Sequence, residues 1–244
     1  MRLALISDIH ANLEALEAVL RDIETADVEK IHCLGDVIGY GCDPVACLRL
    51  VQDHCEIKLM GNHEYAALGL LPPSQMNNLA RQSMEWTVQV ITDQEIAIMA
   101  EFEMDATTAG VYLVHASPCQ PDSWPYILSE TEARQAFPCF SQKITFFGHT
   151  HLPMVFSLAP GDSLRGRVGH DLDFDDDVQT RHLINIGSVG QPRDVDPRAC
   201  YVVFDGEEGS VTYRRVEYDI KATQAKMIRA QLPQQLIERL EVGR

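Results

Sequence analysis

Residues 3–10 read LALISDIH, residues 31–36 read IHCLGD and residues 57–64 read IKLMGNHE. Each stretch opens with apolar residues that suit a buried strand and closes on Asp, His or Asn. Together they decide the fold, because short apolar runs separated by helical patterns indicate parallel strands joined by right-handed crossovers.

Helical patterns fill the two gaps between these stretches. In the first gap, apolar residues recur three or four positions apart behind an expected Asn12 cap, at Leu13, Leu16, Leu20 and Ile23. In the second gap, Pro44 stands at the first helical position, with Asp43 as the expected cap. The first third of the chain is therefore predicted to run β-α-β-α-β.

The remainder of the chain continues with helices and then strands. Residues 64–103 have a helical pattern, with Ser74 and Thr92 as expected caps and Thr92-x-x-Glu95 as a capping box. A short helix is expected after Ser129, and two helices close the chain at 220–231 and 233–240. Further strands are predicted at 111–114, 144–147, 182–186, 201–204 and 211–216. This pattern predicts an α/β fold with two packed mixed β-sheets flanked by helices.

A chain of 244 residues fits one domain, so residues 1–244 are predicted to form a single unit. Residues 64–103 are interpreted as a helical insertion that covers one side of the functional site and shapes substrate choice. The alternative is that they only complete the fold. Residues 160–180 are interpreted as an acidic loop or hairpin, since five of the seven residues 171–177 are Asp without the glycine and glutamate spacing of a calcium loop.

The charge balance limits the partners of this chain. With 20 Lys and Arg against 36 Asp and Glu, the formal net charge is -16, which argues against general affinity for nucleic acid or anionic membranes. We find no apolar stretch long enough for a signal peptide or a membrane span, so a cytoplasmic location is expected. The seven cysteines include no CxxC pair, and we interpret them as reduced, mostly buried thiols.

Side chains that commonly bind metals end five of the strand-like runs. They are Asp8 and His10, Asp36, Asn62, His115, and His149 with His151. Ligands of open α/β sheets bind beyond the carboxyl ends of the strands, so we expect these seven side chains at one shared edge. Imidazole with carboxylate suits Mn, Fe, Zn, Co or Ni, and one bridging carboxylate can hold two such ions. The other histidines follow no such pattern and are interpreted as structural or surface residues: His32, His54, His170 and His182.

The series Asp-x-His, Gly-Asp, Gly-Asn-His-Glu, His and Gly-His-x-His, over residues 8–151, resembles the calcineurin-like metallophosphoesterase superfamily. The later stretch NIGSVGQPR at 185–193 resembles its small bacterial and archaeal phosphodiesterase branch. The resemblance implies an αββα metallophosphoesterase sandwich that holds two divalent transition-metal ions. It assigns Asp36 as the bridging ligand, with Asp8, His10 and His151 on the first ion and Asn62, His115 and His149 on the second.

The resemblance also implies a reaction, in which metal-bound hydroxide attacks the phosphorus of a small phosphate ester. His63 is the expected general acid for the leaving alkoxide, the alternative being that it only binds phosphate or positions a ligand. We expect a phosphodiesterase acting on a nucleotide-type substrate. A broad phosphomonoesterase, a dinucleoside polyphosphate hydrolase or, in a different class, a metal-binding scaffold protein remain alternatives.

Two further residues are candidates for substrate binding. Arg193 could clamp a phosphate, or it could instead pair with Asp194 or Asp196 at the surface. Tyr40 could line the pocket, or it could be a packing residue of a turn. The stretch GDVIGYG at 35–41 departs from the Gly-Asp-x-x-Asp-Arg-Gly of serine/threonine phosphatases. The departure puts protein phosphatase activity in doubt and leaves His63 without the usual acidic partner.

Overall fold

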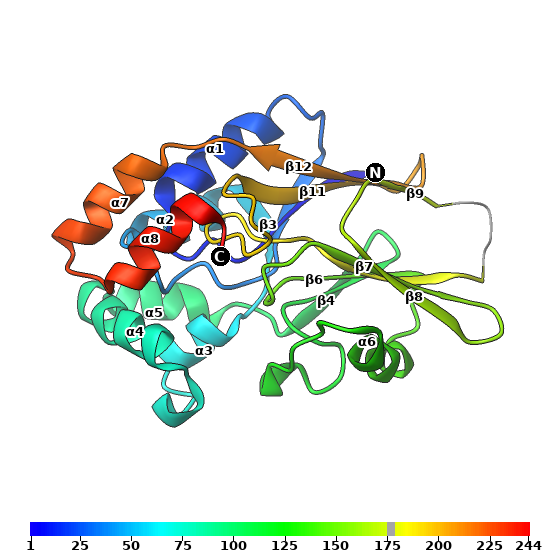
Figure 1. Cartoon of the computed structure of the whole chain (residues 1–244), viewed down its shortest axis with the longest axis horizontal. Coiled ribbons are helices and arrows are strands. Elements are labelled where there is room, and N and C mark those ends of the chain that lie inside the picture. The colour runs from blue at the N-terminus through cyan, green and yellow to red at the C-terminus, as the bar shows by residue number, and fades with distance from the viewer. Residues whose placement is uncertain (175–178) are drawn as a thin grey trace.

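The computed structural model describes residues 1–174 and 179–244, and within these ranges the chain forms two six-stranded sheets and eight α-helices (Figure 1). The first sheet has the strand order β3-β2-β1-β11-β12-β9. Strands β1, β2 and β3 are parallel neighbours, which confirms the predicted β-α-β-α-β start. The strands of this sheet are β1 (Arg2–Ile6), β2 (Lys30–Cys33), β3 (Cys55–Lys58), β9 (Leu172–Asp173), β11 (Ala199–Asp205) and β12 (Ser210–Val216).

The second sheet has the order β4-β5-β6-β10-β7-β8. Strand β6 is parallel to both β5 and β10, and the remaining pairs are antiparallel, so this sheet is mixed like the first. Its strands are β4 (Asp105–Thr108), β5 (Val111–Val114), β6 (Ile144–Phe147), β7 (Met154–Ala159), β8 (Ser163–Val168) and β10 (Arg181–Asn185). The predicted α/β fold of two packed mixed sheets is therefore confirmed.

The two sheets pack face to face, because alternate residues of each strand point into the same apolar layer. Leu3 and Leu5 of β1 meet Phe146 of β6 and Ile184 of β10 in that layer. The other face of β1 carries Ala4 and Ile6, which pack against the helices. A strand buried on both faces needs a continuous apolar run, which is why the first stretch lacks polar alternation.

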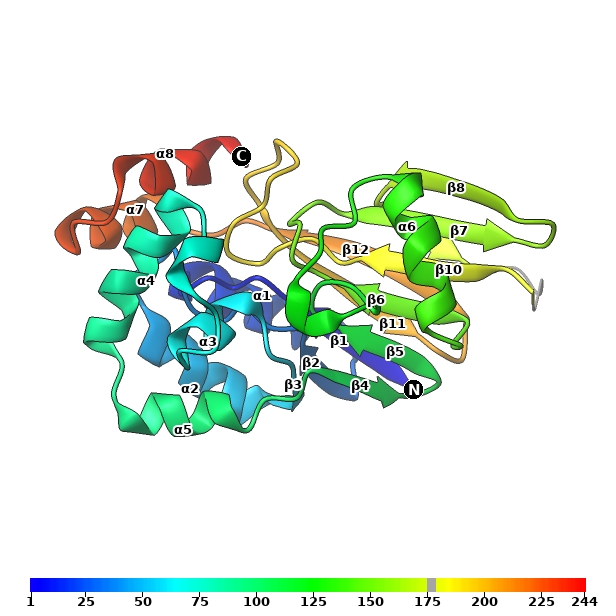
Figure 2. The same ribbon diagram turned by 90° about the horizontal axis from the view of Figure 1, so that it is seen from below.

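Helices cover the outer face of each sheet (Figure 2). Helices α1 (Leu13–Ile23) and α2 (Pro44–His54) pack on the first sheet, and α6 (Glu130–Ala136) crosses the second. A further group gathers at the opposite end from the β7–β8 hairpin: α3 (Asn62–Ala67), α4 (Asn78–Val90), α5 (Asp93–Ala100), α7 (Ile220–Arg229) and α8 (Gln234–Val242). Three short 3-10 turns complete the described helical segments: Pro73–Gln75, Pro121–Ser123 and Phe137–Cys139.

The helix caps are partly as predicted. Asn12 caps α1, and the capping boxes at Thr92 and Ser129 are present. Asp43 stands at the cap position of α2, but its carboxylate binds Lys226 at 3.0 Å and makes no capping bond. The Ser74 prediction is wrong, because α4 begins behind Asn77, whose side chain accepts from Ala80 N.

Four strands were not predicted from the sequence: β4, β7, β8 and β9. Strands β4 and β8 lie at the edges of the second sheet, where exposed polar residues weaken the apolar pattern. Within 160–180, β8 forms a hairpin with β7, and Leu172–Asp173 pairs with β12. The part of the acidic run at 175–177 lies outside the described residues.

The cysteine prediction needs one correction. Cys119 and Cys139 form a disulfide, with Cα atoms 5.4 Å apart. The other five cysteines are free thiols, as expected. Twenty residues separate the bonded pair, so no local spacing signals it, and only the fold around α6 brings the two together. None of the helices in the described ranges has the length and apolar character that crossing a membrane requires.

Candidate metal centre

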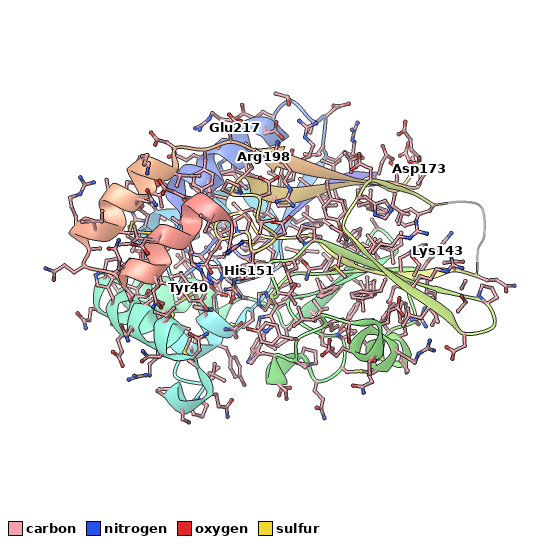
Figure 3. All side chains as sticks on the ribbon, viewed as in Figure 1. Tyr40, Lys143, His151, Asp173, Arg198 and Glu217 are labelled. Carbon is pink, nitrogen blue, oxygen red and sulfur yellow. A yellow bond between two sulfur atoms is a disulfide. The ribbon has the colours of Figure 1, made fainter. Side chains whose placement is uncertain are left out.

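The seven predicted ligands come from both sheets, not from one sheet edge as expected. Strands β1, β2 and β3 of the first sheet end at Asp8, Asp36 and Asn62, whereas β5 and β6 of the second end at His115 and His149. The two sheets are held together here by His149 N–H donating to Asp8 Oδ2 at 3.0 Å and by His115 Nδ1 donating to Leu34 O at 2.7 Å. The site therefore lies where the carboxyl ends of both sheets meet, and His151 marks this place in Figure 3.

The structure gathers six of the seven side chains into two buried groups. Asp8, His10, Asp36 and His151 form one group, and Asp36, His115 and His149 form the other. The possible ligand atoms within each group lie within 4.8 Å of one another. Asp36 belongs to both groups, which is the position a bridging carboxylate needs.

In the first group, two imidazoles turn lone pairs toward each other. His10 Nδ1 donates to Ile38 O at 3.1 Å, and His151 Nδ1 donates to Gln191 O at 2.6 Å. Because carbonyl oxygens only accept, both Nε2 atoms are acceptors when the rings are neutral. These Nε2 atoms lie 3.0 Å apart, and Asp8 Oδ1 lies 3.2 Å from that of His151. Three converging acceptors fit a cation between them.

The second group is oriented in the same way. His115 Nδ1 donates to Leu34 O at 2.7 Å, which leaves its Nε2 facing Asp36 Oδ2 at 3.4 Å. His149 uses the other nitrogen, since its Nε2 donates to Trp124 O at 3.1 Å and its Nδ1 faces the site. Backbone carbonyls thus fix the tautomer of all four candidate histidine ligands, as is usual for metal-binding histidines.

Burial and mutual charge set the protonation of the group. Burial, and then the charge of His115, lower the pKa of His149 to about 3. Burial would also lower the pKa of His115, but Asp36 beside it raises this pKa to about 9. Burial opposes ionisation of Asp36, yet His115 and His63 keep its pKa well below the usual range. Most of the group is therefore already in the state that metal binding requires, and an ion would displace a proton from His115.

Unsatisfied buried atoms provide an independent test of fit. Asn62 Oδ1 and His115 Nε2 are buried without a hydrogen-bond partner among the described residues. A buried polar atom without a partner is costly, and a divalent ion that replaces the His115 proton would satisfy both atoms. Nitrogen and oxygen donors of this kind suit a transition metal, so the residues present fit the cofactor that the sequence predicts.

Glu64 is a site residue that the sequence reasoning did not assign. Its buried carboxylate accepts four backbone N–H groups at 2.8–3.1 Å, from Asp36, Val37, Ile38 and Gly61. It therefore binds the loop that follows β2 to the loop that follows β3. Its place in the Gly-Asn-His-Glu motif was the available signal.

Five of the candidate ligands have backbone conformations that residues other than glycine rarely adopt. Positive φ angles of 49–64° occur at Asp8, His10, Asp36, His149 and His151. Such conformations cost roughly 1 kcal/mol or more each and persist where the surrounding fold imposes them, often at functional sites. Gly61 shows why the loops are so tight, because a Cβ there would lie 2.1 Å from Asp36 Oδ1.

His63 and Tyr40 lie directly beside the first group. The His63 ring is 4.8 Å from the His10 ring and 4.6 Å from the Tyr40 ring, and its backbone N–H donates to Asp36 Oδ1 at 2.9 Å. His63 Nδ1 is buried without a partner in the part of the chain that the structure describes. Burial is also the main reason that the pKa of His63 is lowered. His63 is therefore close enough to act at the site, and no acidic side chain of residues 1–174 or 179–244 hydrogen-bonds its ring.

Arg193 does not form the surface ion pair that was considered for it. Asp194 pairs with Arg215, and Asp196 pairs with Arg198. The Arg193 guanidinium lies 5.8 Å from the Tyr40 ring and donates to Gln191 Oε1 at 2.8 Å. In Figure 3, Tyr40 and His151 lie next to each other below helix α8, and Tyr40 packs between α8 and α4.

A cavity of about 150 Å³ opens beside Asn62 and His149. Tyr126 forms one wall, stacking on His149 at 4.4 Å with 48% of its surface exposed. Residues of the segment 64–103 also line the cavity: Leu71, Gln75, Met76, Asn77 and Ala80. Tyr40, Ser123 and Trp124 complete the lining.

Comparison with known proteins agrees with this geometry. Residues 1–209 match the family model of the calcineurin-like phosphoesterase superfamily domain. An uncharacterised protein of Methanocaldococcus jannaschii is 37% identical over 254 residues, and the match covers 99% of this chain and 98% of that protein. The crystal structure of a metallophosphoesterase from Sphaerobacter thermophilus is 38% identical with a TM-score of 0.86, covering 100% of this chain and 99% of its own. A hypothetical protein of Pyrococcus horikoshii shares the fold, with 17% identity, a TM-score of 0.79, and 100% and 98% coverage.

Proposed function

The chain belongs to the calcineurin-like phosphoesterase superfamily and is a metal-dependent phosphoesterase, and from this premise we propose that it is a phosphodiesterase acting on a small nucleotide-type substrate. One observation carries the proposal: two buried ligand groups share Asp36 and open beside a cavity with aromatic walls. A shared carboxylate suits two-metal phosphate chemistry, and the cavity offers space for an organic group next to the reacting phosphate.

The proposed ligands are those of the two buried groups with Asn62 added. One divalent transition-metal ion would be held by Asp8, His10 and His151. The other ion would be held by Asn62, His115 and His149, and Asp36 would bind both. Such ions supply Lewis acidity, which lowers the pKa of water and offsets charge on phosphate oxygens. Manganese, iron, zinc, cobalt and nickel all accept these donors. Manganese is the ion proposed for the activity assay.

His63 and Arg193 would act on the substrate itself. We assign His63 the protonation of the leaving oxygen, because its Nδ1 has no partner among the described residues and it lies beside Asp36 and His10. Burial favours a neutral His63 ring, and a phosphate anion beside it would favour the protonated form. Arg193 would bind a phosphate oxygen, with Tyr40 packed between it and His63.

The cavity supports a nucleotide-type ester in preference to an ester of a small alcohol. A monoester of a small alcohol would leave the Tyr126 and Trp124 wall without a contact, whereas a nucleoside attached to the phosphate could stack on Tyr126. Gln75 and Asn77 supply amide groups that could hydrogen-bond a base edge. The scaffold alternative is disfavoured because six of the seven proposed ligands lie in two buried groups that share Asp36.

The test uses metal-stripped protein reconstituted with manganese, assayed on bis-p-nitrophenyl phosphate and on p-nitrophenyl phosphate. We expect metal-dependent hydrolysis that is faster with the diester and lost in the His115→Ala protein. Faster hydrolysis of the monoester would instead assign a phosphomonoesterase. Tight metal binding without hydrolysis of either ester would favour the scaffold alternative.

A cytoplasmic location is also part of the proposal. The buried free thiols Cys33, Cys47, Cys55 and Cys200 are consistent with a reducing compartment, whereas the Cys119–Cys139 disulfide is not. Fractionation of cells that express the tagged protein would decide, since recovery outside the cytoplasm would contradict the proposal.

A further inference from the structure

Two arginines meet beside the metal centre with no acidic side chain between them among residues 1–174 and 179–244. Arg193 Nη2 donates to Gln191 Oε1 at 2.8 Å, and Arg239 Nη1 donates to the same oxygen at 3.1 Å. Among residues 1–174 and 179–244, neither guanidinium has an acidic side chain within salt-bridge distance. Two positive charges therefore share one neutral side-chain acceptor, with Arg244 O as a second acceptor for Arg239, and an added anion would reduce their mutual repulsion.

The neighbouring arginines show that this arrangement is specific. Arg198 pairs with Asp196 at 2.7 Å, Arg214 with Asp22 at 2.9 Å, and Arg215 with Asp194. The chain has 36 acidic residues against 20 basic ones, so carboxylate partners are plentiful. The pair at Gln191 lacks what its neighbours have.

The two arginines are connected to the metal centre through hydrogen bonds with His151. Gln191 O accepts the Nδ1–H of His151, and Arg193 N–H donates to His151 O at 3.2 Å. Arg193 Nε is buried without a partner among the described residues, so one donor of this guanidinium is unused. Burial, and then the charge of Arg193, lower the pKa of Arg239, as expected of two guanidinium groups held close together.

Arg239 belongs to a part of the chain that the family model does not include. It lies on α8, beyond residue 209, and its Nε donates to Arg244 O. Figures 1 and 2 both place the end of α8 beside the loop that joins β10 to β11, which carries Gln191 and Arg193. The C-terminal helix thus brings a second guanidinium to the rim of the site.

We propose that Arg239 and Arg193 together bind a second phosphate group of the substrate, next to the phosphate that is hydrolysed. Guanidinium groups match phosphate oxygens with paired donors, and such charge-assisted hydrogen bonds are strong where solvent is partly excluded. The inference rests on the proposed function and narrows it to esters that carry two or more phosphate groups.

Calorimetric titration of the manganese-loaded protein tests the inference without any turnover. Methylenediphosphonate, which has two phosphoryl groups and resists hydrolysis, is compared with methylphosphonate, which has one. The wild type is expected to prefer the diphosphonate, and Arg239→Gln should reduce this preference about tenfold, as the loss of one charge-assisted hydrogen bond predicts. Arg229→Gln is the matched control, because it removes the same charge from an exposed position on α7.

Two further variants separate a binding role from a structural one. Gln191→Glu gives the arginines the carboxylate they lack, so it should weaken diphosphonate binding while raising the thermal unfolding temperature. Arg239→Lys keeps the charge without the planar fork and should lose part of the preference. An unchanged preference in Arg239→Gln, or a Gln191→Glu protein that is stabilised and still binds the diphosphonate as the wild type does, would overturn the inference.

Failure of the inference and failure of the proposed function are distinguishable. Hydrolysis of bis-p-nitrophenyl phosphate with no loss of diphosphonate preference in Arg239→Gln would remove only the second-phosphate site. If bis-p-nitrophenyl phosphate is not hydrolysed but Arg239→Gln loses its preference for the diphosphonate, the second-phosphate site stands and the phosphodiesterase proposal is rejected.

Discussion

The buried carboxylate of Glu64 accepts the backbone N–H of Asp36 at 2.9 Å. The same carboxylate also accepts the N–H groups of Val37, Ile38 and Gly61, so one side chain fixes two of the loops that carry candidate metal ligands. Burial, and then the charge of Asp36, raise the pKa of Glu64 to about 7, which shows how closely the two carboxyl groups are held.

Glu64→Gln should therefore damage both stability and metal binding. The glutamine amide would point an NH₂ group at backbone donors, and losing about two of the four hydrogen bonds should cost about 2–4 kcal/mol in the free energy of unfolding. Urea unfolding and manganese titration measure the two effects. Glu95→Gln is the control, since Glu95 also caps a helix start, at Thr92, but lies outside the candidate metal centre. Equal losses in both variants would contradict the proposed role of Glu64.

Asp36 is the residue whose loss should affect both ions. Wild-type protein is expected to bind two manganese ions per chain, and His115→Ala one, because His115 belongs to only one ligand group. Asp36→Ala should retain at most one weakly bound ion, since it removes a ligand from both groups. Elemental analysis after dialysis gives the counts, with exposed His170→Ala as the control. Two retained ions in Asp36→Ala would exclude the bridging role.

Gly39 leaves room for the His63 ring. A Cβ at Gly39 would lie 1.9 Å from His63 Nδ1, so Gly39→Ala must displace the ring, and kcat for the diester should fall at least tenfold. Gly69→Ala is a matched control, because Gly69 has a similar positive φ of 74° with no atom within 4 Å of the added Cβ. Each variant bears the same backbone strain, so a difference in kcat isolates the contact with His63. Similar kcat values in the two variants would argue against a role for the position of His63.

Tyr126 should determine the preference for nucleotide esters. Removing its ring in Tyr126→Ala takes away the stacking surface of the cavity, and about 1–3 kcal/mol of base stacking would be lost. We expect kcat/KM to fall about tenfold for thymidine 5′-p-nitrophenyl phosphate and to fall much less for methyl p-nitrophenyl phosphate. A parallel loss on both esters would indicate that Tyr126 only supports His149.

His182 should make stability depend on pH far from the metal centre. Burial lowers the pKa of His182 to about 4, and the ring packs on Phe174 and hydrogen-bonds Ser157. A histidine whose folded-state pKa is lowered contributes full stability above its unfolded value near 6.5 and loses it as pH falls toward 4. The loss between pH 7.5 and pH 5 should be about 1–2 kcal/mol.

The His182→Gln protein provides the comparison for that measurement. It cannot titrate in this range, so its free energy of unfolding should fall by about 1–2 kcal/mol less than that of the wild type over the same pH interval. Urea unfolding at both pH values gives the difference. Identical pH dependence in the two proteins would mean that His182 titrates normally in the folded chain.

The boundaries of the central strands could be read closely from sequence, and the reason is local. Strands β5 and β6 occupy the predicted residues 111–114 and 144–147, because apolar runs between turns identify buried strands. The edge strands β4 and β8 were not predicted, because half or more of their side chains are exposed and the apolar run is interrupted. The predicted Asp43 cap is absent because its carboxylate binds Lys226 instead. The predicted Ser74 cap is wrong because the helix begins behind Asn77. The local sequence pattern indicates neither alternative.

The sequence by itself determined which residues could bind metal and in what order they occur, because motifs at strand ends are written within a few consecutive residues. Only the tertiary structure decided that each of the two ligand groups combines residues from both sheets. It also decided that Glu64 joins two loops and that Arg239 meets Arg193 across 46 residues. Such contacts depend on how distant segments pack, and hydrophobic periodicity carries information only about neighbours along the chain.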